Sequence, residues 1–588
     1  MSASDKKNGF INSKYLNAAT AGFVVFAVLL VCVLMFSPHV IGIRSADSHP
    51  DYEDKIFDQS MMTSINIEIS DEEWAAILAN PTAEEYRRCN VTINGKTFYS
   101  VGIRTKGMTS LSQVANSDSD RYSFKLKADQ YIQGQNFFGL EEFVINNMHQ
   151  DPTYMKEYLS YDMMSYIGVP TPLFNFAEIT MNGDPFGLYL AVEVMEEDFA
   201  MRVYGSDFGQ LYKPESMGNI GGGIRLEENI GMQMPGNMAP TPGRQWDETA
   251  GAFPLTEQGG EAGFERENTR QNPGGGVAFP TEGGNVGGNV GGNVGVNAGN
   301  IQFGGNGAFG RFGATGADLI YSGDNISGYS QIFDNAVFKT AHDSDFKRVV
   351  TALKYLNAGE DLEKYVDTDG TLRYFAANTV LVNLDSYVGS LKHNFYLYEK
   401  NGQISILPWD LNLAFGGFQG GTSSSSVNFP IDTPVTGVDL EERPLIGVLL
   451  ADDHYREQYH AFLLEIVDGY FNSGRYDETI TRLDLMIQNS VRNDPTAFYT
   501  YEEYETAVET LRLFGELRAA SIQGQLNGTI PSTYEGQQAN PSALIDASDL
   551  NMDMGGMRNL GVMGGRNPDG TEADGNMRRI RIMDAAVA

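Results

Sequence analysis

The sequence predicts an α+β protein of two lobes, a strand-rich first lobe and a helical second lobe, behind an N-terminal transmembrane helix. Three observations lead to this fold class. Residues 16–36 form an uncharged apolar run. Residues 60–217 are dominated by alternating apolar and polar side chains with turn signals, whereas residues 317–530 carry apolar side chains at helical period. Strands and helices in separate stretches of a chain are typical of the α+β class.

The composition excludes some classes of function. The 588 residues include 76 acidic and 41 basic side chains, which gives a formal charge of −35. A protein that binds nucleic acid needs a basic face to neutralise phosphates, so no nucleic-acid partner is expected. The two cysteines, Cys32 and Cys89, predict no disulfide framework, because Cys32 lies within the apolar run.

The apolar run at residues 16–36 has the length of a membrane-spanning helix. As an α-helix it extends for about 31 Å, which matches the hydrocarbon core of a bilayer. Lysines precede the run and acidic residues follow it. The positive-inside rule then predicts a short cytoplasmic tail at residues 1–15 and an extracytoplasmic body, hence a single-pass membrane protein. A cleaved signal peptide is the alternative, but the run is long for one and lacks a clear cleavage site at residues 37–40.

The first lobe, residues 60–217, follows a linker at residues 37–59. Two turn signals, Asn94-Gly95 and Asn182-Gly183, each separate two alternating stretches and predict β-hairpins. The paired stretches are residues 89–93 with 97–103 and residues 177–181 with 187–193. Further strands are predicted at residues 65–69 and 123–127, and helices at residues 71–78 and 155–166.

The second lobe, residues 317–530, is predicted to be mainly helical. Apolar side chains recur at helical period in residues 345–356, 372–382, 454–471, 476–489 and 501–524. One hairpin interrupts these helices, with strands at residues 394–398 and 404–407 joined by Asn401-Gly402.

Two glycine-rich segments outside the lobes are expected to be disordered. Residues 218–316 contain Gly-Gly-Asn-Val three times in succession, and glycine and asparagine favour neither helix nor strand. Residues 531–588 form a tail that is rich in methionine and glycine. The first segment is interpreted as an insert between the two lobes.

Two aspartates of the second lobe flank its hairpin. Asp385 follows the apolar helix that ends near residue 382, and Asp410 follows the second strand of the hairpin. This order of elements can bring the two carboxylates to the same opening of the fold, and Asn394 lies close to both in sequence. Carboxylate and amide oxygens are ligands that Mg²⁺ prefers. The alternative is that Asp385 caps a turn and Asp410 is an ordinary loop residue.

The first lobe carries a few basic residues that stand out in an acidic chain. Arg104 and Lys106 lie where a strand runs into a hydroxyl-rich turn, and main-chain N–H groups in such a turn can bind phosphate. Lys125 and Lys127 share one face of the next strand, and Glu157 on the following helix is a candidate partner for one of them. The alternative is a solvated strand face.

These residues lie in motifs that resemble the spore coat protein H (CotH) kinase-like family. The resemblance covers most of residues 60–217 and 317–530. Its motifs are Gly102 to Gly107, Asn146 to Thr153, Gly187 to Leu190 with Glu193, Leu211 to Pro214, Asn383 to Tyr387, His393 to Tyr398 and Pro408 to Asn412. The family is similar to divergent protein kinases. The resemblance therefore implies a two-lobed protein-kinase-like fold and phosphate transfer from ATP to serine or threonine with a divalent metal.

The resemblance also implies roles for single residues. Asp385 matches the family's catalytic aspartate and Asp410 its metal-binding aspartate. In phosphoryl transfer generally, one aspartate orients the acceptor hydroxyl, an asparagine and a second aspartate hold metal, and a lysine neutralises phosphate. By analogy, Asn394 is assigned to the metal, and Lys125 to the phosphates with Glu157 as its partner.

Four further residues are assigned to ATP by the same analogy. Lys106 and Arg104 are expected to contact phosphate from the turn, and Glu193 and Met195 to lie beside the adenine.

The sequence thus predicts a membrane-anchored atypical protein kinase. It is expected to use ATP with Mg²⁺ or Mn²⁺ and to modify serine or threonine of a surface, spore-coat or cell-envelope protein. One alternative is a kinase-like surface binding or structural protein without catalysis. Another is a cell-wall assembly factor, in which the Gly-Asn repeats are a flexible spacer. An extracytoplasmic domain meets little ATP, and a fold does not establish an activity.

Overall fold

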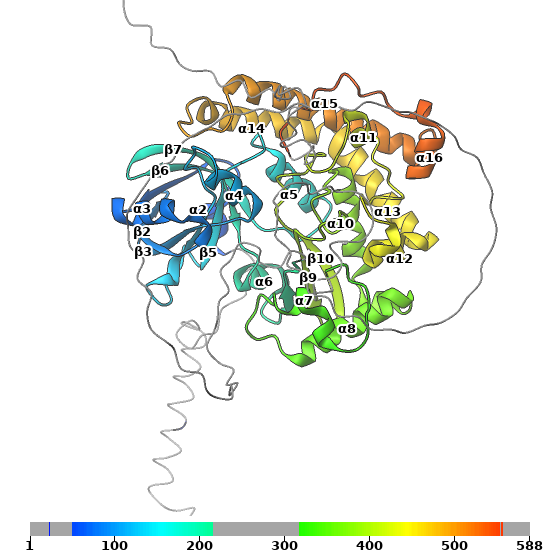
Figure 1. Cartoon of the computed structure of the whole chain (residues 1–588), viewed down its shortest axis with the longest axis horizontal. Helices are drawn as coiled ribbons and strands as arrows, with labels where there is room; N and C mark the ends of the chain where they lie inside the picture. Colours follow the sequence, from blue (N-terminus) through cyan, green and yellow to red (C-terminus); the bar gives the residue numbers. More distant parts are fainter. Residues whose placement is uncertain (1–22, 24–49, 216–316, 553, 557–588) are drawn as a thin grey trace, which may run out of the picture. The chain divides into compact units, whose positions relative to one another are not determined.

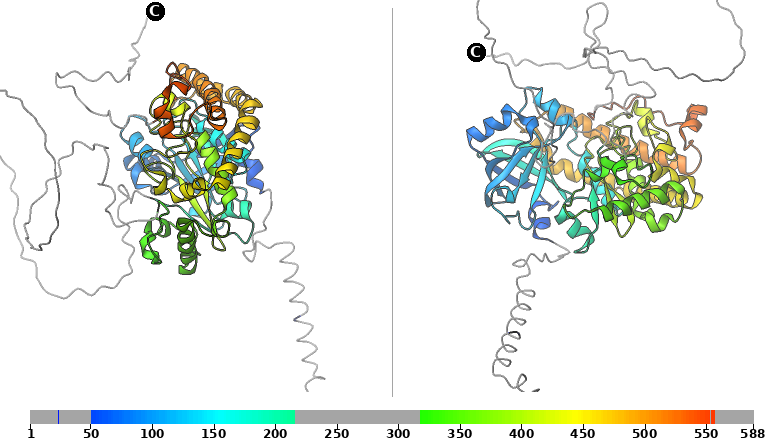
Figure 2. Two further views of the ribbon diagram at one scale, coloured as in Figure 1. Left: turned by 90° about the vertical axis from the view of Figure 1, so that its right-hand side faces the viewer. Right: turned by 60° about the horizontal axis from the view of Figure 1, so that its bottom comes forward.

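The computed structural model describes residue 23 and residues 50–215, 317–552 and 554–556. The predicted insert at residues 218–316 lies outside the described residues. Residues 50–215 and 317–556 belong to one structural unit. Figure 1 shows the strands of its first part as one group and the later helices as another, and the right view of Figure 2 shows the same two groups side by side.

Seven strands of the first part close into a barrel in the order β1-β2-β3-β4-β5-β7-β6. Adjacent strands pair antiparallel, except that β1 pairs in parallel with β6. The predicted hairpins at Asn94-Gly95 and Asn182-Gly183 are confirmed as the pairs β2–β3 and β6–β7. The strands are β1 (Thr63–Glu68), β2 (Arg87–Ile93), β3 (Lys96–Thr105), β4 (Phe124–Lys127), β5 (Glu142–Asn146), β6 (Phe174–Met181) and β7 (Asp184–Glu193).

The closed barrel corrects the prediction of a two-lobed protein-kinase-like fold with a strand-rich first lobe. The pairing that closes the barrel sets Thr63 of β1 opposite Ala177 of β6, more than a hundred residues away. A parallel pairing of this kind is not made by a tight turn, so no turn signal marks it in the sequence. The pattern therefore predicted individual strands and missed the closure.

Strand β5, the first half of β6 (residues 174–177) and the second half of β7 (residues 188–193) are buried on both faces, which joins the barrel to the helices. Successive side chains of a strand point to opposite faces. In β5, Phe143 and Ile145 belong to the barrel core, whereas Val144 between them belongs to the core shared with the helices. In β7, Tyr189 and Leu190 divide between the two cores in the same way. The barrel and the helices are therefore packed through the strands themselves.

The helices surround a three-stranded sheet of order β10-β9-β8, formed by β8 (Gln210–Tyr212), β9 (Phe395–Lys400) and β10 (Gln403–Pro408). Helix α5 (Lys156–Tyr166) contacts both β6 and α10 (Thr368–Val380). The long helices predicted for the second lobe are confirmed as α8 (Asp343–Ala358), α10, α13 (Asp453–Ile466), α14 (Arg475–Arg492) and α15 (Tyr501–Leu526). The shorter helices are α2 (Asp51–Ile56), α3 (Asp71–Ala79), α4 (Thr109–Ala115), α6 (Glu197–Tyr204), α7 (Ser330–Phe333), α9 (Leu362–Tyr365), α11 (Ser423–Val427), α12 (Pro444–Ala451) and α16 (Tyr534–Ala539).

The longest described helix is amphipathic rather than membrane-spanning. Helix α15 has 26 residues, but Glu502, Glu509 and Glu516 place charges along its length. Across the described part of the chain, no helix combines the length and the hydrophobicity that crossing a membrane requires. The described residues therefore do not support the predictions of a transmembrane helix and of a single-pass membrane protein with an extracytoplasmic domain. The segment predicted to span, residues 16–36, lies outside the described residues apart from Phe23.

The segment after residue 530, which was expected to be disordered, packs on the helices as far as it is described. It contains α16, and Met554 is fully buried. The side chain of Asn428 bonds both main-chain groups of Ile545: it donates to the carbonyl oxygen at 2.8 Å and accepts from the N–H at 3.0 Å.

The described chain ends in two glycines that lie against other loops. A Cβ at Gly555 would lie 2.3 Å from the carbonyl oxygen of Gln150, and one at Gly556 would lie 2.2 Å from that of Gly417. Only glycine fits such close backbone approaches. The buried Lys156 donates a hydrogen bond to the carbonyl oxygen of Gly555 at 3.3 Å.

Candidate functional site

Asp385 and Asp410 lie on two loops that are bonded to each other. The Asp385 loop (residues 381–389) follows α10, and the Asp410 loop (residues 409–417) follows β10. The main-chain N–H of Phe415 donates to the carbonyl oxygen of Leu381 at 2.6 Å. Asp410 has a left-handed φ of 57°. Such a conformation is uncommon for a residue other than glycine and is frequent at functional sites.

Asp385 is held by two side chains that precede β9. Its Oδ2 accepts a hydrogen bond from Nδ2 of Asn394 at 2.9 Å, and its Oδ1 lies 2.8 Å from Nε2 of His393. Burial opposes a charge on His393, but the bond to Asp385 and the nearby carboxylate of Asp410 raise the pKa of His393. The structure thus brings Asp385 and Asn394 together and adds His393, whose signal was its place next to Asn394 in the chain.

Lys106 follows β3 and is joined to Glu157 through Asn146. Nζ of Lys106 donates to Oδ1 of Asn146 at 2.8 Å, and Nδ2 of Asn146 donates to Oε2 of Glu157 at 2.9 Å. Nζ of Lys106 also lies 5.8 Å from the ring centre of Trp409, the residue before Asp410. The amide of Asn146 therefore bridges a cation and an acid at the end of the barrel, a role that sequence reasoning missed.

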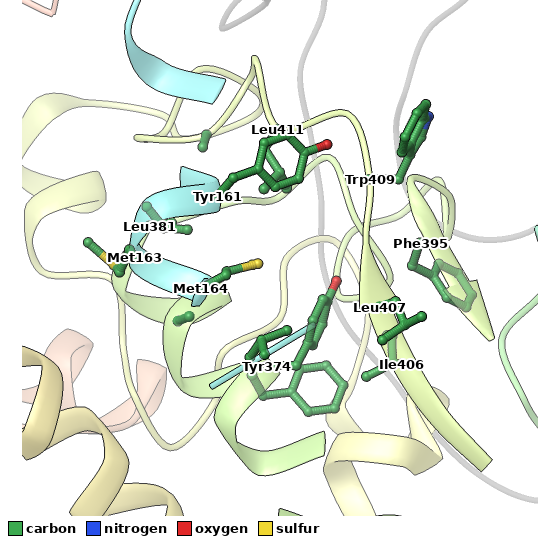
Figure 3. Close-up of a cluster of buried hydrophobic side chains, with 14 of the residues drawn as sticks. Tyr161, Met163, Met164, Tyr374, Leu381, Phe395, Ile406, Leu407, Trp409 and Leu411 are labelled. Atoms are coloured by element: carbon green, nitrogen blue, oxygen red, sulfur yellow. The ribbon is translucent and has the colours of Figure 1, made fainter. Parts of the chain in front are cut away.

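Glu157 connects this group to Asp410. Its side chain is buried, and burial together with the charge of Asp410 raises the pKa of Glu157 to about 7, although Lys106 and the bond from Asn146 lower it. Helix α5, which carries Glu157, also supports Asp410, because the main-chain N–H of Asp410 donates to the hydroxyl of Tyr161 at 3.3 Å. Figure 3 shows Tyr161 beside Leu411, in the hydrophobic cluster on which the site rests.

Lys125 has other partners than the one predicted for it. Its Nζ forms ion pairs with Glu142 and, at 3.4 Å, with Glu196. Burial raises the pKa of Glu142, but the bond from Glu196 and the charge of Lys125 outweigh it and lower that pKa to about 2. The neighbour of Glu157 is therefore Lys106, and Lys125 is neutralised by other carboxylates.

The other residues assigned to the nucleotide also have partners within the protein. Arg104 pairs with Glu84. Glu193 is fully buried, accepts a bond from the hydroxyl of Tyr52 at 2.9 Å and pairs with Arg202 at 2.5 Å. Met195 is fully buried in the core shared with the helices. Contacts of these three residues with a nucleotide stay predictions.

The acidic side chains of the site suit a metal ion that binds to the protein together with a phosphate group. In the residues described by the structure, no group of three or more His, Cys, Asp or Glu side chains is arranged to hold a metal ion. Mg²⁺, however, commonly binds through one or two carboxylates together with substrate phosphates and water. Asp385 and Asp410, with the amide of Asn394, fit this second mode.

These contacts define a class of site, in which two loops that carry aspartates are bonded to each other, and Asp410 lies near a buried glutamate that an amide joins to a barrel lysine. Comparison with known proteins places the chain in a family. It matches the family model described as "CotH kinase protein" over residues 103–248 and 306–522. Because the match covers more than half of the chain, the protein belongs to the CotH family, and the resemblance seen in the sequence is confirmed.

A curated relative is similar over a short stretch. It is the inner spore coat protein H of Bacillus subtilis (strain 168), which is 30% identical over 90 residues. This stretch covers 15% of the present chain and 25% of the relative. The chain therefore aligns with about a quarter of that protein's length.

Proposed function

We propose that the protein transfers the γ-phosphate of ATP to serine or threonine of another protein. The observation that carries the proposal is the junction of the two bonded loops, where Asp385 is held by Asn394 and Asp410 lies close to Glu157 and its neighbour Lys106. Phosphoryl transfer needs a hydroxyl-orienting aspartate, oxygen ligands for metal and a cation for phosphate. The family's description as a kinase supports the same reaction.

In this proposal each side chain has one task. Asp385 orients the acceptor hydroxyl, and Asp410 and Asn394 hold Mg²⁺ or Mn²⁺. The metal, when bound, neutralises charge on the phosphates. We assign the phosphate contact of the barrel to Lys106, because Lys125 is already paired with two carboxylates.

We infer that the acceptor is a protein of a spore coat or cell envelope. The support is the name of the relative, an inner spore coat protein. A kinase-like assembly protein without catalysis is the competing function, and it predicts no metal-dependent binding of nucleotide.

The test is transfer of labelled phosphate by the full chain with ATP and Mg²⁺ or Mn²⁺, onto itself or onto added protein. Asp385→Asn and Asp410→Ala are expected to abolish labelling. Asp369→Asn is the matched control, because Asp369 is an aspartate on the surface of α10 that pairs with Arg373. Equal labelling by the wild type and both site variants contradicts the proposal. A melting shift with ATP and metal that Asp410→Ala removes separates kinase from assembly protein.

A further inference from the structure

Arg443 is buried against the Asp385 loop and bonds main-chain oxygens. It precedes α12 and is 3% exposed. Its Nε donates to the carbonyl oxygen of Tyr387 at 2.7 Å, and its Nη2 to that of Gly389 at 2.6 Å. Its Nη1 donates to the carbonyl oxygen of Glu442 at 2.8 Å. Two of its three bonds therefore restrain the turn that directly follows Asp385.

Burying this guanidinium costs free energy. Its presence at a buried position therefore indicates that the arrangement of its hydrogen-bond donors is needed there. Burial lowers the pKa of Arg443, although Tyr387, Asp318 and Glu442 oppose that shift. An apolar side chain of similar volume is often as stabilising at a buried position as a charged one. What an apolar side chain lacks is the planar fork of donors, which can hold two carbonyl groups at a fixed spacing.

The turn that Arg443 holds is tight. The N–H of Gly389 donates to the carbonyl oxygen of Ser386 at 3.2 Å. A Cβ at Gly389 would lie 2.0 Å from the carbonyl oxygen of Leu384. Asp385 lies between Leu384 and Ser386, so a shift of the carbonyls that Arg443 holds is passed to Asp385 through very few bonds.

We propose that Arg443 is a positioning residue, which fixes the direction of the Asp385 carboxylate relative to Asp410 by holding the carbonyl groups of Tyr387 and Gly389. Its effect on the loop follows from these contacts alone. Its effect on rate rests on the proposed function. Lysine at this position keeps the charge but offers a compact ammonium instead of a fork, so it does not restrain both carbonyls.

The test compares Arg443→Lys with Arg456→Lys in the full chain. Arg456 is the matched control, because it also donates to a main-chain oxygen, that of Leu450 at 2.9 Å, but lies on α13 and pairs with the exposed Asp453. Hydrogen exchange of peptides covering residues 383–393 is expected to be about tenfold faster in Arg443→Lys, as loss of a buried hydrogen bond predicts. Exchange in Arg456→Lys is expected to equal that of the wild type.

The second readout is the rate of phosphate transfer, measured where circular dichroism shows the variant folded. A misdirected Asp385 is expected to lower kcat about 10- to 100-fold, while KM for ATP changes by less than about twofold. A merely structural role lowers Tm and leaves kcat unchanged. Arg443→Met replaces the lysine variant if that variant does not fold.

The outcomes separate this inference from the proposed function. Unchanged exchange at residues 383–393 overturns the inference, and so does faster exchange with unchanged kcat. If the wild type transfers no phosphate while Arg443→Lys speeds exchange, the proposed function fails and the restraint of the loop by Arg443 stands.

Discussion

The wall of the barrel and its end hold their basic residues in different ways. On the wall, formed here by β3 and β4, Arg104 and Lys125 pair with carboxylates. At the end of β3, Lys106 donates instead to the neutral amide of Asn146. The acid beyond that amide, Glu157, has a pKa raised to about 7 by burial and by Asp410, so it is only partly ionised near neutral pH. A lysine that carboxylates neutralise attracts an anion weakly, whereas the lysine at the end keeps most of its positive field.

The largest expected effect comes from removing one lysine from each region. Lys106→Met is expected to lower phosphate transfer about 100-fold, because it removes a charge that acts on the phosphates. Lys125→Met is expected to change transfer by less than about threefold, since the charge of Lys125 is balanced by Glu142, whose pKa is lowered to about 2. Initial rates at saturating acceptor provide the measurement. If Lys125→Met lowered the transfer rate more than Lys106→Met, Lys125 would be the lysine that contacts phosphate. The contrast between the wall and the end of the barrel would then be wrong.

A second effect concerns pH and the turn that follows Asn146. His149 packs edge-on against Phe498, with ring centres 5.0 Å apart, and burial lowers the pKa of His149 to about 4. The unfolded chain takes up this proton below about pH 6.5, whereas the folded chain takes it up only near pH 4. Stability is therefore full above pH 6.5 and falls as the pH drops toward 4, by up to about 3 kcal/mol.

Urea unfolding at about pH 7 and about pH 4.5 measures this loss. His149→Asn, which has no proton to gain, is expected to lose less stability between the two pH values than the wild type. An equal loss in both proteins would show that His149 is already accessible to protons in the fold.

A third effect is the stability of the bridge at the barrel end. Asn146→Leu leaves Nζ of Lys106 and Oε2 of Glu157 without the amide that joins them, which is expected to cost about 2 kcal/mol. Urea unfolding at neutral pH measures the change in the free energy of unfolding. A neutral outcome would mean that Lys106 and Glu157 meet directly once the amide is gone.

The smallest effect is expected on the wall. Glu84→Gln removes the partner of Arg104, but both side chains of this pair are partly exposed, at 20% for Arg104 and 35% for Glu84. Exposed ion pairs contribute less than about 1 kcal/mol. The same unfolding experiment is expected to show a loss of this size in the free energy of unfolding. A loss as large as that of Asn146→Leu would show that the wall and the end of the barrel do not differ in this respect.

The sequence predicted local structure well because local structure has local causes. Asn94 and Gly95 have the positive φ values, 46° and 86°, that a two-residue hairpin turn requires, and these residue types favour them. The two aspartates were recognised because each follows an element with a clear period. Barrel closure depends on a pairing between distant strands, for which no residue type is diagnostic.

Side-chain partners were the part of the site that sequence reasoning could not reach. Register places Arg104 opposite Lys125, and Lys127 opposite Glu142. Two cations face each other on the wall, so both need carboxylates. Glu84 pairs with Arg104, whereas Glu142 of β5 and Glu196 after β7 pair with Lys125. A pairing rule based on order along the chain assigned Glu157 to the wrong lysine, because it had no information on register.

The end of the described chain affects how this protein should be produced. The family match stops at residue 522, whereas the fold continues to Gly556, which lies on the backbone of Gly417 in the Asp410 loop. A shortened protein cut at the family boundary loses α16, the buried Met554 and the contact of Gly556 with the Asp410 loop. Inactivity of such a fragment would therefore report on the cut and not on the proposed function.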